Sequence, residues 1–286
     1  MRYELRDAGR TSRLEIAWSN CRIYFDHLSN DWRYRRFRGH RLPDFLIIGC
    51  QKGGTTSLFD DLARHPDVVA SKDKEVHYFD LNYEMGVNWY RSHFPKTREG
   101  VAGEASPYYL FHPLVPGRAK KLLPDCRLIA LLRNPVERAW SHYQMEWRNG
   151  DEPLSFEEAI AREKERLEGE ESKMVDDPLY DSFKHRHYSY IARGLYVIQL
   201  ERWLRYFSRD QLLVSSSEHY FDNSQAMYDR LTRFLNIGLH DPGEFASINK
   251  GEYSGLNAAT RRRLEAFYRP YNERLYRLLG EDLGWA

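Results

Sequence analysis

An apolar segment that runs directly into a glycine-rich turn limits most strongly what this chain can fold into. Residues 45–48 read FLII, which predicts a buried strand, and QKGGTTS follows at 51–57. The glycine pair lets the backbone turn, and the first N–H groups of a following helix attract anions. The residues of this predicted phosphate-binding loop are Lys52, Gly53, Gly54, Thr55, Thr56 and Ser57.

The predicted loop is not a Walker A motif. In that motif the lysine directly follows the second glycine and precedes a Ser or Thr that binds Mg²⁺, whereas Lys52 precedes the glycine pair. The segment therefore predicts an anion site of a different kind. The alternative, from this segment alone, is a structural strand-to-helix turn with a capping Thr and a solvated Lys.

The chain is close to neutral, with a net charge of +1, and has three cysteines. A protein that coats nucleic acid is normally strongly basic, so we expect no nucleic acid partner. Cys21, Cys50 and Cys126 lack metal-ligand spacing, which favours buried thiols and a reducing compartment. No apolar run approaches the ~20 residues that span a bilayer, and the first residues lack a signal-peptide core. These features predict a cytoplasmic protein with no transmembrane segment.

Short apolar runs alternate with helical segments from residue 43 onward, which is typical of βαβ units. We therefore expect an α/β fold with a central parallel sheet flanked by helices. The expected strands are 45–48, 68–70, 101–104, 128–132 and 212–215. The expected helices are 56–64, 113–123, 136–148, 188–207, 224–235 and 257–279, the last bent at Pro270.

Two charged regions stand apart from this pattern. Residues 1–41 are expected to form a basic and aromatic extension to a single domain of residues 42–286, and five arginines lie at its end in WRYRRFRGHR. That 33–41 patch predicts either a solvated arm or a peripheral contact with a polyanion or membrane phosphates. Residues 157–177 are rich in Glu and Lys, which favours an exposed helix over a lid across the site.

A second anion-binding signal follows the expected strand at 128–132. Arg133 lies at the end of this strand, and Ser141 comes two turns into the next helix. Ligands of open parallel sheets bind beyond the carboxyl ends of the strands, so both residues are candidates for a second phosphate. A P-loop NTPase usually has a carboxylate at such a strand end to help hold Mg²⁺, so Arg133 favours phosphate binding without metal. The alternative is an Arg paired with Glu137 and a Ser that faces solvent.

The third signal is KEVHYFD at residues 74–80. In an extended segment Glu75 and His77 share a side, so one of them can accept a proton from a substrate hydroxyl while the other steadies it. The alternative is an acid and a histidine that lie on the surface without a chemical role.

Together, the three signals resemble, in order and spacing, the sulfotransferases that use 3′-phosphoadenylyl sulfate, and specifically their heparan sulfate sulfotransferase branch. The resemblance covers residues 43–285. Its specific elements are QKGGTTSL, HPDV at 65–68, KEVHYF, RNPVERAWSHY, RGLYVIQLERWLRYF at 193–207, and NKGEYSGL followed by FYRPYNERLYRLLG.

The resemblance implies a role for each matching residue. The glycine-rich loop would surround the 5′-phosphosulfate of the donor, with Lys52 near the bridging oxygen that leaves. Arg133 and Ser141 would hold the 3′-phosphate. Glu75 matches the acid that is read as the catalytic base, and His77 is its neighbour in that motif. A later loop that closes on the nucleotide matches Lys250, Gly251 and Tyr253.

The implied reaction is an in-line transfer of the sulfuryl group to a hydroxyl or amine of a carbohydrate or other small acceptor, with adenosine 3′,5′-bisphosphate as the product. Lys52 and the helix N-terminus would stabilise the leaving oxygen, Glu75 would remove the acceptor proton, and no metal is required. We expect burial beside Tyr78 and Phe79 to raise the pKa of Glu75 and so to strengthen it as a base.

One position departs from the resemblance, and two other functions fit parts of the sequence. The heparan sulfate branch tends to have a Lys after the Glu of the third strand, where this chain has Ala105, so acceptor contacts do not transfer to this chain. The first alternative is a P-loop nucleotide kinase, which would require Mg²⁺. The second is a non-catalytic module that retains the nucleotide pocket and binds polyanions through its arginine-rich arm.

Overall fold

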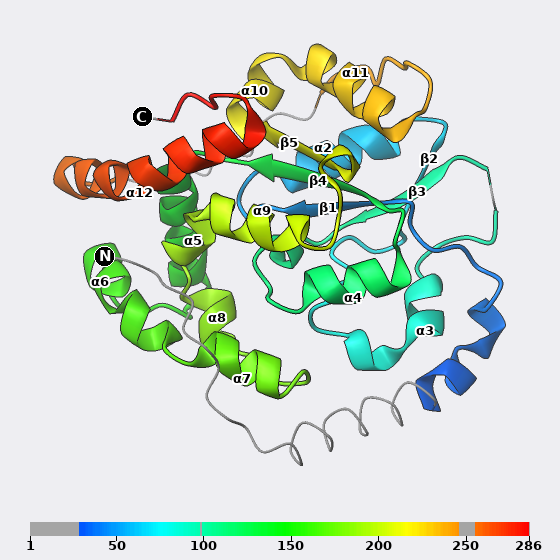
Figure 1. The fold of residues 1–286 in the computed structure, drawn as a ribbon, viewed down its shortest axis with the longest axis horizontal. Helices are drawn as coiled ribbons and strands as arrows, with labels where there is room; N and C mark the ends of the chain where they lie inside the picture. Colours follow the sequence, from blue (N-terminus) through cyan, green and yellow to red (C-terminus); the bar gives the residue numbers. More distant parts are fainter. Residues whose placement is uncertain (1–28, 98, 246–254, 286) are drawn as a thin grey trace.

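The computed structural model describes residues 29–97, 99–245 and 255–285 (Figure 1). Most of the predicted extension lies outside the described residues, and so does Cys21. The same is true of the predicted nucleotide loop at Lys250, Gly251 and Tyr253. The roles of these three residues and the domain boundary at 41 and 42 therefore stay predictions.

Five parallel strands form the central sheet, in the order β2-β3-β1-β4-β5. The predicted α/β fold with a parallel sheet is confirmed, and each expected strand is present to within one residue at either end. The strands are β1 (Phe45–Gly49), β2 (Val68–Ala70), β3 (Val101–Ala105), β4 (Arg127–Leu132) and β5 (Leu212–Ser216).

Helices cover both faces of the sheet (Figure 1). Alternate side chains of β1 enter different cores: Leu46 and Ile48 pack with one helical layer, and Phe45 and Ile47 pack with the other. Burial on both faces explains why the strands read as continuous apolar runs. One layer contains α4 (Val115–Leu122), α9 (Tyr196–Leu204) and part of α12 (Ala258–Leu279), and the other contains α2 (Thr55–Ala63), α10 (Ser217–Asp222) and α11 (Ser224–Leu235).

A further group of helices extends from the carboxyl end of β4. Asn134 caps α5 (Pro135–Asn149) by accepting hydrogen bonds from the N–H groups of Val136 and Glu137. The charged region at 157–177 contains α6 (Phe156–Leu167), which begins with a capping box, and α7 (Glu170–Asp176). The charged faces of α6 are exposed while Phe156, Ala159 and Ile160 are buried, as expected for a surface helix. Helix α8 (Phe183–His187) follows.

The prediction of one helix over 188–207 is wrong for its first eight residues, because α9 begins only at Tyr196. The buried carboxylate of Glu163 accepts hydrogen bonds from the N–H groups of Ile191 and Ala192, at 2.6 and 2.7 Å. The Tyr268 hydroxyl donates to the Ile191 carbonyl at 3.0 Å. These side chains replace the helical partners of the backbone, so the segment forms a short 3₁₀ turn (Ala192–Gly194) instead.

The described part of the arginine-rich arm is anchored at its end. Arg41 pairs with Asp44 and donates to the carbonyls of Glu99 and Gly100, at 2.8 and 2.9 Å, directly before β3. The other four arginines of the patch, at 33, 35, 36 and 38, are exposed. The patch thus lies at the opposite end of β3 from the carboxyl ends of the strands, and its contact with a polyanion or membrane stays a prediction. Among the described residues, no helix is long and apolar enough to cross a membrane.

Candidate active site

The loop after β1 forms a tight turn directly beside β4. The Cys50 N–H donates to the Leu131 carbonyl at 2.7 Å, and a Cβ at Gly53 would lie 2.6 Å from that same oxygen, so only glycine fits there. Gly54 has a φ of 84° and precedes the first residue of α2, which confirms the predicted strand, loop and helix. The Ser217 hydroxyl donates to the Gly53 carbonyl and closes the turn from α10. Ser217 has no local sequence signal, because it joins the loop only through the fold.

The structure brings Lys52 and Arg133 together at the carboxyl ends of β1 and β4, where the parallel-sheet rule predicted both residues. The Arg133 guanidinium donates to the Lys52 carbonyl at 3.2 Å, and Lys52 Nζ lies 3.8 Å from Met145 Sδ on α5. Glu137 pairs with Arg261. The alternative in which Arg133 pairs with Glu137 is therefore not what the fold forms.

Ser141 lies on α5 with its side chain buried, so the alternative of a solvent-facing Ser is wrong. Arg133 directly precedes the Asn134 cap of the same helix. The Tyr196 hydroxyl donates to the Arg133 carbonyl at 2.8 Å and fixes the backbone there. Contact of Arg133 and Ser141 with a 3′-phosphate stays a prediction.

Glu75 and His77 lie side by side, but not because their segment is extended. Both residues have left-handed backbone, with φ values of 58° and 53°. The Glu75 N–H donates to the Ala105 carbonyl at 3.0 Å, which attaches the segment to the end of β3. His77 Nε2 lies 3.3 Å from Glu75 Oε2, and His77 Nδ1 lies 2.8 Å from Asp80 Oδ2. The imidazole therefore stands between two carboxylates.

The pKa shifts of Glu75 and His77 differ from the shift that the sequence predicted for Glu75. Burial disfavours the protonated form of His77, but the hydrogen bonds to Asp80 and Glu75 outweigh it and raise the pKa of His77 to about 10. The hydrogen bond from His77 lowers the pKa of Glu75, against the opposing effect of burial. The expected rise in the pKa of Glu75 is therefore wrong. At neutral pH His77 is a cation, and Glu75 is the group of this pair that can accept a proton.

A buried polar network supports the segment from beneath. The His77 N–H donates to Ser106 Oγ at 3.1 Å, and Ser106 Oγ donates to Glu104 at 2.7 Å. Glu104 also accepts from the hydroxyls of Tyr90 and Tyr109, both at 2.8 Å. Burial raises the pKa of Glu104, and these donors partly oppose it. The network fixes the turn that carries the candidate base.

Lys74 connects the candidate base to the anion-binding loop. Its Nζ donates to Thr56 Oγ1 in the first turn of α2 and lies 3.5 Å from Glu75 Oε1. Lys74 and Asp80 were missed as site residues, although both belong to KEVHYFD. The spacing of three residues from His77 to Asp80, which matches one turn, was an available signal for Asp80.

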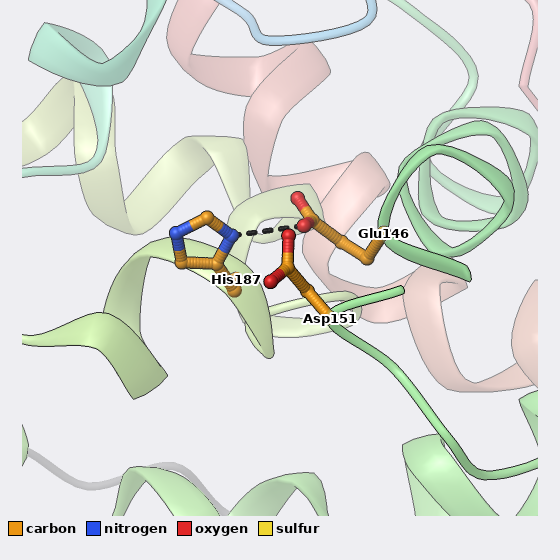
Figure 2. A group of neighbouring side chains, drawn as sticks. All are labelled: Glu146, Asp151 and His187. Carbon is orange, nitrogen blue, oxygen red and sulfur yellow. Dashed lines mark hydrogen bonds and ion pairs between the residues drawn. The ribbon is translucent and has the colours of Figure 1, made fainter. Parts of the chain in front are cut away.

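Three side chains at the end of α5, in the loop after it and on α8 form a group of metal-ligating type. Figure 2 shows the side chains of Asp151 and His187 directed toward Glu146, and their ligand atoms lie within 4.8 Å of one another. Glu146 interacts with His187 Nδ1 at 2.8 Å and with His142 Nε2 at 3.0 Å. Although burial favours the neutral acid, these hydrogen bonds lower the pKa of Glu146 to about 2. They tie α8 to α5, the helix that carries Ser141.

Comparisons with known proteins agree with this arrangement. Residues 42–251 match the family described as Sulfotransferase domain, and the chain belongs to that family. It is 31% identical to human heparan sulfate glucosamine 3-O-sulfotransferase 6, over 86% of this chain and 74% of the relative. It is 28% identical to the membrane-associated sulfotransferase kil1 of Dictyostelium discoideum, over 85% of this chain and 66% of the relative.

A solved structure shares the fold. The crystal structure of a sulfotransferase from Alicyclobacillus acidocaldarius is similar with a TM-score of 0.70 and 30% identity, over 85% of this chain and 98% of that chain. These findings confirm the predicted class of enzyme, a sulfotransferase, and favour neither the kinase nor the non-catalytic module.

Proposed function

We propose that this sulfotransferase moves the sulfuryl group of 3′-phosphoadenylyl sulfate to a hydroxyl or amine of a glycan acceptor. The observation that carries the proposal is the link from Thr56 through Lys74 to Glu75. It places a carboxylate that can accept a proton beside the loop and helix N-terminus that suit a phosphosulfate.

The reaction follows from the charges in this site. The acceptor oxygen or nitrogen attacks sulfur, and the bond from sulfur to the bridging phosphate oxygen breaks, so negative charge collects on that oxygen. Lys52 and the N–H groups at the start of α2 stabilise this charge. Glu75 takes the acceptor proton, and the protonated His77 steadies Glu75. The donor, when bound, supplies the sulfuryl group, and adenosine 3′,5′-bisphosphate leaves.

The acceptor class is supported by the relative that is named for heparan sulfate glucosamine. The Ala105 carbonyl accepts a hydrogen bond from Glu75, but the Ala105 side chain offers no charge to an anionic acceptor. The acceptor contacts at this position therefore differ from those of the heparan sulfate branch, which tends to have a Lys there. Incubation with labelled donor and a panel of glycans, phenols, lipids and peptides tests the proposal, and we expect sulfated product from a glycan. Exclusive sulfation of a phenol or peptide would contradict it. The cytoplasmic location is a separate expectation, which stays a prediction. One of the relatives is described as membrane-associated.

We expect adenosine 3′,5′-bisphosphate to bind more than ~10-fold tighter than AMP, because each charge-assisted hydrogen bond to the 3′-phosphate contributes ~1.5–3 kcal/mol. Titration calorimetry measures both affinities. The comparison variant is Arg133→Ala, which should weaken the binding of adenosine 3′,5′-bisphosphate more than that of AMP and so narrow the difference between the two affinities. Equal affinities of the unmodified protein for the two nucleotides would remove the basis for the donor assignment.

Chelation with EDTA should leave turnover unchanged, because the proposed groups that act on the leaving oxygen are Lys52 and backbone N–H groups rather than an ion. The measurement is kcat before and after EDTA treatment, and again after Mg²⁺ or Zn²⁺ is added back. This test is informative because Glu146, Asp151 and His187 could together hold a metal ion. A loss of turnover that a metal restores would assign an ion to that group or to the donor loop.

A further inference from the structure

Lys74 joins two segments that are separate in the sequence, the loop after β2 and the first turn of α2. Its Nζ donates to Thr56 Oγ1 and lies 3.5 Å from Glu75 Oε1. The Lys74 side chain keeps 30% of its surface exposed and the Glu75 side chain 43%, so both stay accessible from solvent. Among the described residues, the ion pairs of Glu75 are with Lys74 and with the protonated His77.

Each oxygen of the Glu75 carboxylate faces its own cation. Oε1 faces Lys74, and Oε2 lies 3.3 Å from His77 Nε2, whose other ring nitrogen is held by Asp80. From β3, the uncharged Ala105 carbonyl accepts a hydrogen bond from the backbone N–H of Glu75 at 3.0 Å. A phosphosulfate bound at the Thr56 turn would place negative charge close to Glu75, and Lys74 is the cation that lies between them.

We propose that Lys74 is a positioning residue that aligns Glu75 with the donor loop and shields it from the negative charge of the donor. The inference rests on the proposed function of the site. Lys74 acts through Glu75 and Thr56, so it differs from Lys52, which we assign to the leaving oxygen. After the larger effect of the His77 hydrogen bond, the charge of Lys74 also lowers the pKa of Glu75, so the carboxylate stays ionised to lower pH.

The test compares Lys74→Gln, Lys74→Arg and the control Lys72→Gln. Lys72 lies in the same loop, but its Nζ donates to the Ser92 carbonyl at 3.2 Å. We expect Lys74→Gln to lower kcat roughly tenfold at pH 5, and less at pH 8, because the base is displaced and easier to protonate. Lys74→Arg should restore most of the loss, and Lys72→Gln should match the unmodified enzyme.

A second readout does not depend on activity. The Glu75 carboxyl carbon, assigned by comparison with Glu75→Gln, can be titrated by ¹³C NMR, and in Lys74→Gln it should titrate at higher pH than in the unmodified protein. If no acceptor is sulfated, the proposed function fails while this titration still tests Lys74. An unchanged titration, or a kcat loss that is equal at all pH values and not rescued by Arg, would overturn the inference.

Discussion

Replacement of Glu75 by Gln is expected to lower turnover by ~10² to 10⁴, the usual effect of losing a general base. The amide keeps the size and hydrogen-bonding reach of the side chain but cannot take the acceptor proton. The donor contacts of Lys52 and the α2 N-terminus stay in place, so the affinity for adenosine 3′,5′-bisphosphate should be unchanged. Single-turnover rates and calorimetry on the same protein separate these two effects.

His77→Ala is the control for this result and should reduce turnover less, because His77 orients Glu75 and does not take the proton. Since the pKa of His77 is raised to about 10, the imidazole stays protonated between pH 6 and 8. The kcat of the unmodified enzyme should therefore show no inflection near the ordinary histidine pKa of ~6.5. Near-normal turnover of Glu75→Gln together with an inactive His77→Ala would make the histidine the base.

Lys52→Ala should impair donor binding and turnover together. The ammonium meets the phosphosulfate before transfer, and loss of one charged hydrogen bond of ~1.5–3 kcal/mol weakens binding by ~10- to 150-fold. The same charge stabilises the leaving oxygen, so turnover should fall by a further ~10² to 10³. Calorimetry with adenosine 3′,5′-bisphosphate and turnover at saturating donor measure the two losses. Normal donor affinity in this variant would place Lys52 outside the donor site.

The strands and the donor loop were predictable because their signals are local. A continuous apolar run at β1, two glycines and a Thr-rich helix start lie within thirteen residues, and the parallel-sheet rule then placed Arg133 beside Lys52. The start of α9 was not predictable in this way. It depends on Glu163, a carboxylate from α6 that is about thirty residues away along the chain and takes the backbone N–H groups at Ile191 and Ala192.

The electrostatics of the base was the other part that the sequence could not supply. Tyr78 and Phe79 follow Glu75 closely in the chain and suggested an apolar environment, but both side chains point into the core. Left-handed turns at Glu75 and His77 instead bring the acid beside a cation. Lys74 and Ser217 were missed for a related reason, because each reaches the donor loop across the fold rather than along the chain.

The left-handed backbone in the site has a consequence for the stability of the whole protein. Within the described part of the chain, four residues other than glycine have this conformation, and three of them are Lys52, Glu75 and His77. Each costs about 1–2 kcal/mol relative to an ordinary conformation. Glycine would relieve this strain at every one of these positions, but it would remove the side chain that we propose for the chemistry. At these three positions a cost in backbone strain thus accompanies a side chain that we propose for the chemistry, as expected for strain that is stored at a functional site.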